Sequence, residues 1–145
     1  MIYEDRVPPK EELKAKKTVG KSFDPSAIDR SILKTFPYEY PYRPIQVEHT
    51  TDEFTCLCPF NELPDQATLT IKYVPDKLCI ELKSFKYYLY SFRQVRIFHE
   101  HAVNKILEDL VAVLDPLELT VIGKFAIRGG IGTTVTASYK KGRRE

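Results

Sequence analysis

Residues 67 to 74 alternate between apolar and polar side chains, which is the period of a β-strand with one buried face. The apolar positions are Ala67, Leu69, Ile71 and Tyr73, and threonine or lysine stands between them. Such a strand folds stably only when another layer covers its apolar face. The rest of the chain must therefore supply an amphipathic partner for this strand.

That partner is a long amphipathic helix, predicted over residues 94 to 114. Apolar side chains recur along it with helical spacing. They are Val95, Phe98, Ala102, Val103, Ile106, Leu107, Leu110, Val111 and Leu114. Asp115-Pro116 is expected to end the helix, because a proline disfavours helical backbone in the residue before it.

Further strand-like segments lie on both sides of this helix, at 45–55, 78–81, 117–127 and 132–139. We expect the strands before the helix to pair antiparallel, including pairing across the turn at 75–77. The two strands after the helix are expected to form a hairpin through Arg128-Gly129-Gly130. This order predicts an α+β fold, with helices on one face of an antiparallel sheet of two strand pairs.

The N-terminal quarter shows weaker signals. Residues 1–24 are charged and poor in apolar side chains, so we expect a poorly ordered arm before a single domain at 25–145. Ser26 is expected to cap a short helix that ends near Leu33. Three prolines at 37–44 are expected to prevent regular structure there.

Composition limits the kind of protein. A chain of 145 residues is the size of one domain, and its net charge of +2 is too balanced to indicate nucleic acid or membrane as the main partner. Three cysteines do not make a disulfide framework and fit a reducing compartment. Without a signal-peptide pattern or a membrane-spanning run, we expect a cytoplasmic protein.

Cys58 and Asp65 are candidate reactive residues. Cys58 stands where a strand is expected to end, directly before Pro59, and Asp65 follows across a loop. A cysteine attacks as the thiolate, and a carboxyl shielded from water can stay protonated and serve as an acid. The residues alone favour the alternative, a structural cysteine and a turn aspartate.

A zinc site is a second alternative. Cys56 and Cys58 point to the same face of a strand and are suitable zinc ligands. His99 and His101, however, point nearly opposite ways on a helix, so at most one of them faces the cysteines. His99 and Glu100 place donor and acceptor groups where the helix meets the sheet. Zinc is therefore not the favoured interpretation.

The stretch 81–88 mixes charge with aromatic side chains. Read as a helix, it places an apolar stripe on one side and Lys83 and Lys86 together on another. Glu81 can accept hydrogen bonds from a ligand, and the two lysines can hold phosphate oxygens. The residues alone favour an ordinary amphipathic turn with solvated lysines.

The same residues occur together in a known family motif, Glu81-Leu82-Lys83-Ser84-Phe85-Lys86-Tyr87-Tyr88. Around it stand Phe54-Thr55-Cys56-Leu57-Cys58-Pro59, Pro64-Asp65-Gln66-Ala67, Ser91-Phe92-Arg93, Phe98-His99-Glu100, and Gly123-Lys124-Phe125 with Arg128-Gly129-Gly130. In order and spacing, this set resembles the 7-cyano-7-deazaguanine reductases, which are nitrile reductases of queuosine biosynthesis. The resemblance covers roughly residues 45 to 139 and fits the short, single-module branch.

The resemblance implies a tunnelling fold related to GTP cyclohydrolase I. In short members two pentameric rings face each other, with active sites between subunits. It also implies a four-electron reduction of a nitrile to a primary amine with two NADPH, in the modification of tRNA. The product is 7-aminomethyl-7-deazaguanine.

Site roles follow from the resemblance residue by residue. Cys58 is the implied nucleophile that forms a thioimide, and Asp65 the implied proton donor. The implied substrate contacts are Ile80, Glu81, Leu82, His99 and Glu100, and the implied contacts to the NADPH phosphates are Lys83 and Lys86. No metal is implied. Cys56 departs from the family pattern and is interpreted as a bystander. The rival interpretations are a zinc-dependent pterin or cyclohydrolase-type enzyme of the same fold, and a ring-forming binding protein without chemistry.

Overall fold

The computed structural model describes residues 22–142. The predicted arm at 1–24 therefore lies outside the described residues, except for its last three. The strands are β1 (Thr35–Pro37), β2 (Val47–Leu57), β3 (Pro64–Val74), β4 (Leu78–Ile80), β5 (Glu118–Arg128) and β6 (Ile131–Lys140). The helices are α2 (Leu82–Tyr90) and α3 (His99–Leu114), with 3-10 turns at Pro25–Ala27 and Arg30–Ile32.

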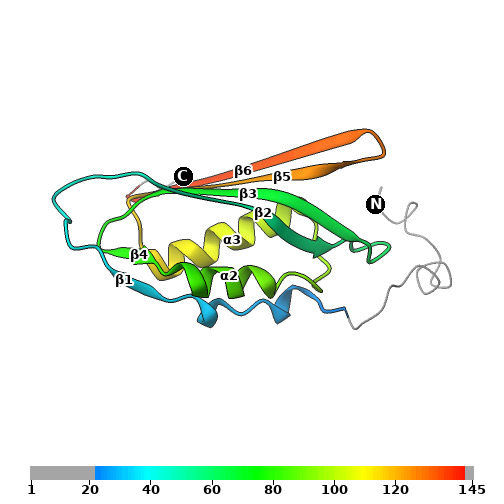
Figure 1. The fold of residues 1–145 in the computed structure, drawn as a ribbon, viewed down its shortest axis with the longest axis horizontal. Helices are drawn as coiled ribbons and strands as arrows, with labels where there is room; N and C mark the ends of the chain where they lie inside the picture. The colour runs from blue at the N-terminus through cyan, green and yellow to red at the C-terminus, as the bar shows by residue number, and fades with distance from the viewer. Residues whose placement is uncertain (1–21, 143–145) are drawn as a thin grey trace.

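Two strand pairs form the main sheet. Its four strands are antiparallel throughout, in the order β2-β3-β5-β6. Helices α2 and α3 both lie on one face of this sheet (Figure 1). The predicted α+β architecture, with helices on one face of an antiparallel sheet, is confirmed. Between residues 22 and 142, no helix is long and apolar enough to cross a membrane.

The long helix begins five residues later than predicted, at His99 instead of residue 94. The preceding segment is extended, and Val95 and Arg96 form isolated bridges with Phe23 and Leu57. Val95 is nevertheless fully buried. The prediction was wrong here because an apolar residue at helical spacing is equally well buried by an extended segment.

The short strand β4 was expected to pair with the strand at 67–74, and this prediction was wrong. It pairs with β1 in a separate two-stranded sheet, where Thr35 lies opposite Ile80. The prediction that the prolines exclude regular structure was also wrong, because Pro37 ends β1. A proline is tolerated at a strand end, where no ladder hydrogen bond from its nitrogen is needed.

The predicted helix after Ser26 is instead a pair of 3-10 turns. Ser26 is not the cap: its own amide donates to Asp24 Oδ1 at 2.8 Å. Asp29 Oδ1 accepts in the same way from the amide of Ser31 at 2.9 Å. The side chains of Asp24 and Asp29 each accept from a backbone amide in place of a helical carbonyl. Each aspartate therefore starts a separate turn, and one continuous helix does not form.

Glycines allow a tight turn between β5 and β6 and a close approach of α3 to β5. Gly129 and Gly130 have φ values of 57° and 79°, the left-handed backbone that a tight hairpin needs, as predicted. At Gly123 a Cβ atom would lie 2.8 Å from Cγ2 of Val103. The missing side chain lets the side chain of Val103 on α3 approach the backbone of β5 closely.

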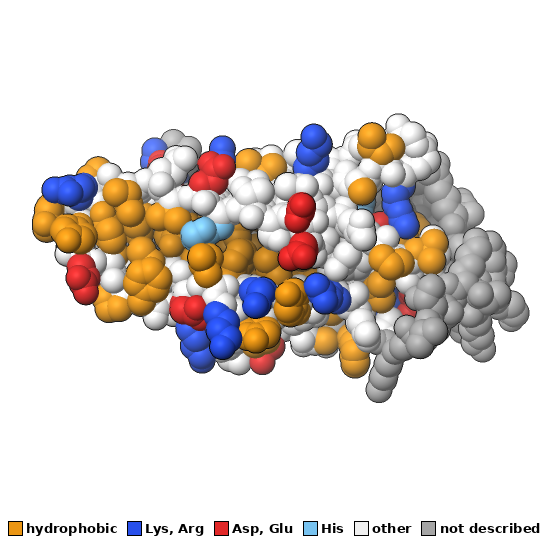
Figure 2. All heavy atoms as spheres, in the orientation of Figure 1, with side chains coloured by type: hydrophobic (Ala, Val, Ile, Leu, Met, Phe, Trp, Pro, Cys, Tyr) orange, Lys and Arg blue, Asp and Glu red, His pale blue; other side chains and the backbone are white. Residues whose placement is uncertain are grey.

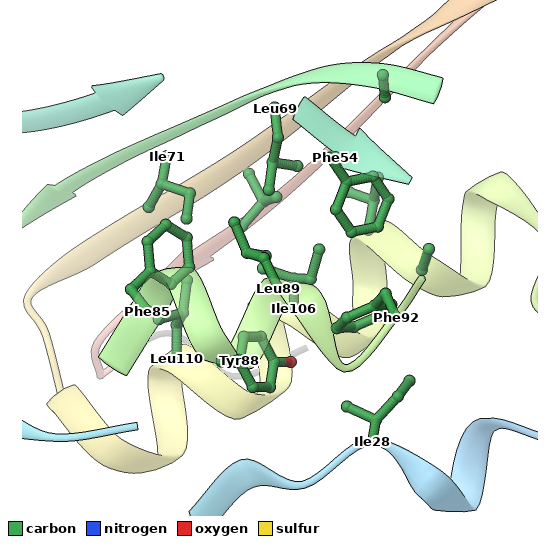
Figure 3. Packing of buried hydrophobic residues seen from close by; sticks show 14 of the residues in the cluster. Ile28, Phe54, Leu69, Ile71, Phe85, Tyr88, Leu89, Phe92, Ile106 and Leu110 are labelled. Atoms are coloured by element: carbon green, nitrogen blue, oxygen red, sulfur yellow. The ribbon is translucent and has the colours of Figure 1, made fainter. Parts of the chain in front are cut away.

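The core lies between the sheet and the two helices. Figure 3 shows side chains of both layers meeting there. The labelled residues of the sheet and helices are Phe54, Leu69, Ile71, Phe85, Tyr88, Leu89, Phe92, Ile106 and Leu110, and all are buried. Ile28, also buried, comes from the N-terminal segment on the other side of the helices. The strand at 67–74 contributes its predicted apolar face to this core.

Candidate active site

Cys58 follows the last residue of β2 and opens a short loop to β3. Its amide donates to the carbonyl of Leu63, and its carbonyl accepts from the amide of Glu62, both at 2.9 Å. Glu62 takes left-handed backbone with φ 58°, which closes the loop tightly. The thiol is partly exposed, so the fold holds this cysteine at a fixed and accessible position.

Asp65 lies just inside β3, and its side chain is almost completely buried. Both of its oxygens have a basic partner from another element. Arg128 Nη1 donates to Oδ1 at 2.9 Å, and His99 Nε2 lies 3.2 Å from Oδ2. The structure thus brings Asp65 together with His99, which the sequence placed 34 positions away. A carboxyl held by an arginine on one oxygen and a histidine on the other is fixed in direction as well as in position.

His99 is the first residue of α3 and is held on two sides. Besides its contact with Asp65, its ring stacks on Phe125 of β5, with 3.8 Å between centroids and 9° between planes. The β3–β5 register places Phe125 opposite Ala67, two residues beyond Asp65. Sequence reasoning gave Arg128 and Phe125 no role beyond the family motif, because only the strand register brings them to the carboxyl.

Cys56 differs sharply from Cys58. It is fully buried and lies directly opposite Asp65 in the β2–β3 ladder. Burial, followed by the nearby Asp65 and Cys58, raises the pKa of the Cys56 thiol to about 12. Cys56 is therefore a neutral thiol near pH 7 and a poor nucleophile.

The side chains offer no metal cluster in the described part of the chain. Between residues 22 and 142, no group of three or more His, Cys, Asp or Glu side chains is placed to hold an ion. His101 is exposed and its ring meets Phe98 edge-on, at 5.8 Å between centroids. Glu100, also exposed, stands in the first turn of α3 beside His99.

The remaining predicted substrate residues, Ile80, Glu81 and Leu82, lie near the opposite end of β3 from Asp65. Ile80 is buried and its amide donates to the hydroxyl of Tyr73 at 3.0 Å. Tyr73 stands eight residues along β3 from Asp65, which is about 26 Å at the usual rise of a strand. Within one chain, Asp65 and Ile80 therefore cannot contact the same small molecule.

Glu81 caps helix α2 at this second end. Its two carboxylate oxygens accept from the amides of Lys83 at 2.7 Å and Ser84 at 2.8 Å. These backbone hydrogen bonds, that of Ser84 first, hold the pKa of Glu81 below its usual value. A carboxylate has about four acceptor positions, so each oxygen keeps one for a ligand.

Lys83 and Lys86 project from the exposed side of α2, as predicted. A hollow of about 340 Å³ lies between β2 and α2, and Lys86, Tyr90 and His49 are among its lining residues. The ammonium of Lys86 lies 5.3 Å from the centroid of the Tyr87 ring. Lys86 lines this hollow, and Lys83 stands three residues before it on α2, so the two cations could hold phosphate oxygens.

Fold and site together define an α+β protein with antiparallel strand pairs, a partly exposed cysteine at the end of β2 and a buried carboxyl on β3 paired with an arginine and a histidine. A model of the family described as QueF-like protein matches residues 64–144, more than half of the chain. The chain belongs to this family.

Curated relatives support the same assignment. A protein of Caldicellulosiruptor bescii is 54% identical over 114 residues, which are 79% of this chain and 87% of that protein. A protein of Thermoanaerobacter pseudethanolicus is 51% identical, over 79% of this chain and 86% of that protein. Both are named NADPH-dependent 7-cyano-7-deazaguanine reductase.

A solved structure shares the fold. The apo form of the archaeosine synthase QueF-Like matches with a TM-score of 0.63 and 24% identity. The match covers 70% of this chain and 99% of that one. At this identity the likeness concerns the architecture alone.

Proposed function

We propose that this chain is an NADPH-dependent reductase that converts 7-cyano-7-deazaguanine to 7-aminomethyl-7-deazaguanine, in the cytoplasm, for queuosine in tRNA. The observation that carries the proposal is the accessible Cys58 at the end of β2, in a chain 54% identical to a protein of that name. The cyano group is an electrophilic carbon, and a thiolate is a suitable nucleophile for it.

The proposed chemistry begins at Cys58. Its sulfur adds to the nitrile carbon, and the nitrogen takes a proton from the carboxyl of Asp65, which gives a thioimide. NADPH supplies one hydride to each of two reductions. The first hydride adds to the thioimide carbon; the carbon–sulfur bond then breaks, which releases the Cys58 thiolate and leaves an imine. The second hydride adds to the imine carbon while the nitrogen takes a second proton from water, which gives the amine. Two hydrides and two protons account for the four hydrogens gained.

Other residues have proposed binding roles. His99 and Glu100 contact the substrate near the Asp65 end of β3, since both lie in the first turn of α3 and His99 contacts Asp65. Ile80, Glu81 and Leu82 contact its base from the other end. Because these ends lie about 26 Å apart along β3, we assign them to neighbouring copies. We propose the tunnelling fold related to GTP cyclohydrolase I, closed into paired pentameric rings with a site between subunits.

The NADPH phosphates are assigned to Lys83 and Lys86, which are exposed on one side of α2. Residues 25–145 are proposed as one reductase domain. Cys56 has no catalytic role in this proposal, because its pKa of about 12 keeps it protonated.

The decisive experiment mixes the protein with 7-cyano-7-deazaguanine without NADPH. We expect a thioimide absorbance and a mass adduct on Cys58, followed by NADPH oxidation when the cofactor is added. Cys58→Ala should abolish both, whereas the matched variant Cys56→Ala should retain them. Absence of any adduct would favour the non-catalytic binding protein, and stoichiometric zinc on a cysteine would favour the cyclohydrolase-type enzyme.

A subunit-mixing experiment tests the shared site. Cys58→Ala and Glu81→Ala should each be inactive alone. Co-expressed in equal amounts, they should recover about a quarter of the starting activity, because one site in four then combines an intact Cys58 with an intact Glu81 from its neighbour. If both residues served one chain, mixing would recover nothing.

A further inference from the structure

A short backbone ladder holds the end of β2 against the segment that leads into α3. The amide of Leu57 donates to the carbonyl of Val95 at 2.9 Å, and the amide of Ile97 donates to the carbonyl of Leu57 at 3.1 Å. Cys58 follows Leu57 directly, and His99 opens α3 two residues after Ile97. The ladder therefore sets how the loop from β2 to β3, which begins at Cys58 and is called the thiol loop below, lies relative to the start of α3.

The N-terminal segment lies on the other side of this ladder. The amide of Phe23 donates to the carbonyl of Gln94, and the amide of Arg96 donates to the carbonyl of Phe23, both at 2.8 Å. In Figure 1 the N-terminal segment then runs along the helices on the side away from the sheet. Segment 94–97 is thus bonded on one side to the N-terminal segment and on the other side to β2.

Side chains also join the N-terminal segment to the thiol loop. The hydroxyl of Ser22 donates to Glu62 Oε1, and Arg96 Nε lies 4.0 Å from the same oxygen. The side chain of Glu62 is only 14% exposed, whereas the glutamates of two other ion pairs, Glu48 and Glu118, are each 51% exposed. Figure 2 shows hydrophobic side chains beside charged ones at the end of the molecule that carries this loop. Because Glu62 is shielded from water, its contacts are weakened less by solvent than those of an exposed pair.

The backbone of Glu62 takes a conformation that favours glycine. Its φ is 58°, and its amide donates to the carbonyl of Cys58 at 2.9 Å, which closes the thiol loop. A residue with a side chain at such a φ costs free energy and persists where the surrounding structure holds it in place. The contact with Ser22 is one such restraint, because it fixes the Glu62 side chain from another part of the chain.

Arg96 makes the weaker of the two contacts to Glu62. Its Nε is buried and has no hydrogen-bond partner among residues 22–142. The 4.0 Å from Nε to the carboxylate oxygen exceeds hydrogen-bonding length, so Nε attracts the carboxylate without a direct bond. Of the two, the hydroxyl of Ser22, which donates directly, is therefore the stronger hold on Glu62.

We propose that Glu62 is a positioning residue for Cys58, and that Ser22 ties the thiol loop to the N-terminal segment through it. The inference rests on the proposed function and adds to it a residue that acts through Cys58 instead of touching the substrate. With the loop tied in this way, the sulfur is held where the nitrile carbon arrives. Without the Glu62 side chain the loop keeps its backbone hydrogen bonds, but the sulfur spends less time in that position.

The test compares Glu62→Gly, Glu62→Gln and Ser22→Ala in the full chain. Glycine suits the left-handed backbone, so Glu62→Gly removes the side chain without straining the loop. Glu62→Gln keeps an acceptor oxygen for the hydroxyl of Ser22. The control is Glu118→Ala, which removes a glutamate from an exposed ion pair with Lys140 at the other end of the sheet.

The main measurement is the rate of thioimide formation after mixing with 7-cyano-7-deazaguanine without NADPH, followed by stopped-flow absorbance. Glu62→Gly should slow this step by roughly 10-fold to 100-fold, the cost of a misplaced reacting atom. Ser22→Ala should slow it in the same direction, whereas Glu62→Gln and Glu118→Ala should stay near the starting rate. Ser22→Ala in the Glu62→Gly background should cause no further slowing, because Ser22 acts through Glu62.

Two further measurements separate positioning from a general structural role. Iodoacetamide should label Cys58 in Glu62→Gly at least as fast as in the starting protein, because alkylation needs no alignment with a bound nitrile. In a Cys58→Ala background, calorimetry should give the same Kd for 7-cyano-7-deazaguanine with and without Glu62→Gly, because no contact to the base is removed. Thermal melting of each variant identifies any loss of folding.

Three results would overturn the inference while leaving the function intact. The first is a starting rate of thioimide formation in Glu62→Gly or, if that variant does not fold, in Ser22→Ala. The second is an equal slowing in Glu118→Ala. The third is a parallel loss of iodoacetamide labelling, which would mean that the thiol itself has become unreactive. If the starting protein forms no thioimide at all, the proposed function fails, and the positioning role fails with it.

Discussion

Asp109 joins three parts of the molecule and is a sensitive point of its stability. It lies on α3 with no exposed surface. Its carboxylate accepts from the hydroxyl of Tyr88 on α2 at 2.6 Å, from Arg30 Nε at 2.8 Å and from Lys105 Nζ at 3.0 Å. Burial raises the pKa of Tyr88, so its hydroxyl stays protonated and donates.

We expect Asp109→Ala to lower the free energy of unfolding by about 2–4 kcal/mol. The hydroxyl of Tyr88 is fully buried, and leaving it without a partner costs about 1–3 kcal/mol. The side chains of Arg30 and Lys105 are 48% and 30% exposed, so water can replace the carboxylate. Each of these ion pairs therefore contributes at most about 1 kcal/mol.

The measurement is urea denaturation monitored by circular dichroism. The slope of the free energy of unfolding against urea concentration is compared between variants. Glu108→Ala is the matched control, because Glu108 is the exposed neighbour on the same helix and its removal should change stability by less than about 0.5 kcal/mol. Tyr88→Phe in the Asp109→Ala background should recover part of the loss, since it removes the unpaired hydroxyl. A loss below about 1 kcal/mol in Asp109→Ala would refute the reasoning, because it would mean that the buried hydroxyl finds another partner.

Three further predictions concern packing, pH and thiol reactivity. Gly123→Ala should lower the free energy of unfolding by about 1–3 kcal/mol, because the new Cβ would lie 2.8 Å from Cγ2 of Val103. An unchanged melting temperature would contradict this close approach. Glu81 has a folded pKa below its ordinary 4.5, so its stabilising effect is present above pH 4.5 and is lost as the pH falls through the folded pKa. The stability difference between the starting protein and Glu81→Ala should therefore shrink in acid; a difference constant with pH would disprove the cap. Iodoacetamide near pH 8 should label Cys58 and spare Cys56, whose pKa is about 12, as peptide mass mapping can check.

Local patterns predicted most of the secondary structure. The alternation at 67–74 was confirmed within β3, and the glycine turn was confirmed between β5 and β6. Both depend on neighbours in sequence, through side-chain period and backbone freedom. The start of the long helix was missed because the backbone bridges of Val95 to Phe23 and of Arg96 to Leu57 depend on segments far away in the chain.

The site divides in the same way. The residues and their spacing named Cys58, Asp65, His99 and Glu81, and the family motif gave each an expected role. The sequence could not say that Asp65 is held by Arg128 and His99, because strand register and helix packing bring these side chains together. The sequence also predicted Cys56 to be a bystander, but it could not give the physical cause, because the raised pKa of the Cys56 thiol arises from burial in the finished core.

By itself, the sequence predicted the α+β class and the amphipathic layers, because side-chain periodicity is a local property. Its family motif added the prediction that Cys58 is the reactive thiol. Only the tertiary structure decided how far apart the two halves of the proposed site lie. Asp65 and Tyr73 share one strand, and a strand has a fixed rise per residue, about 26 Å over this span. That rigid length separates the carboxyl from Glu81 within one chain, which is why we propose that a second copy completes the site.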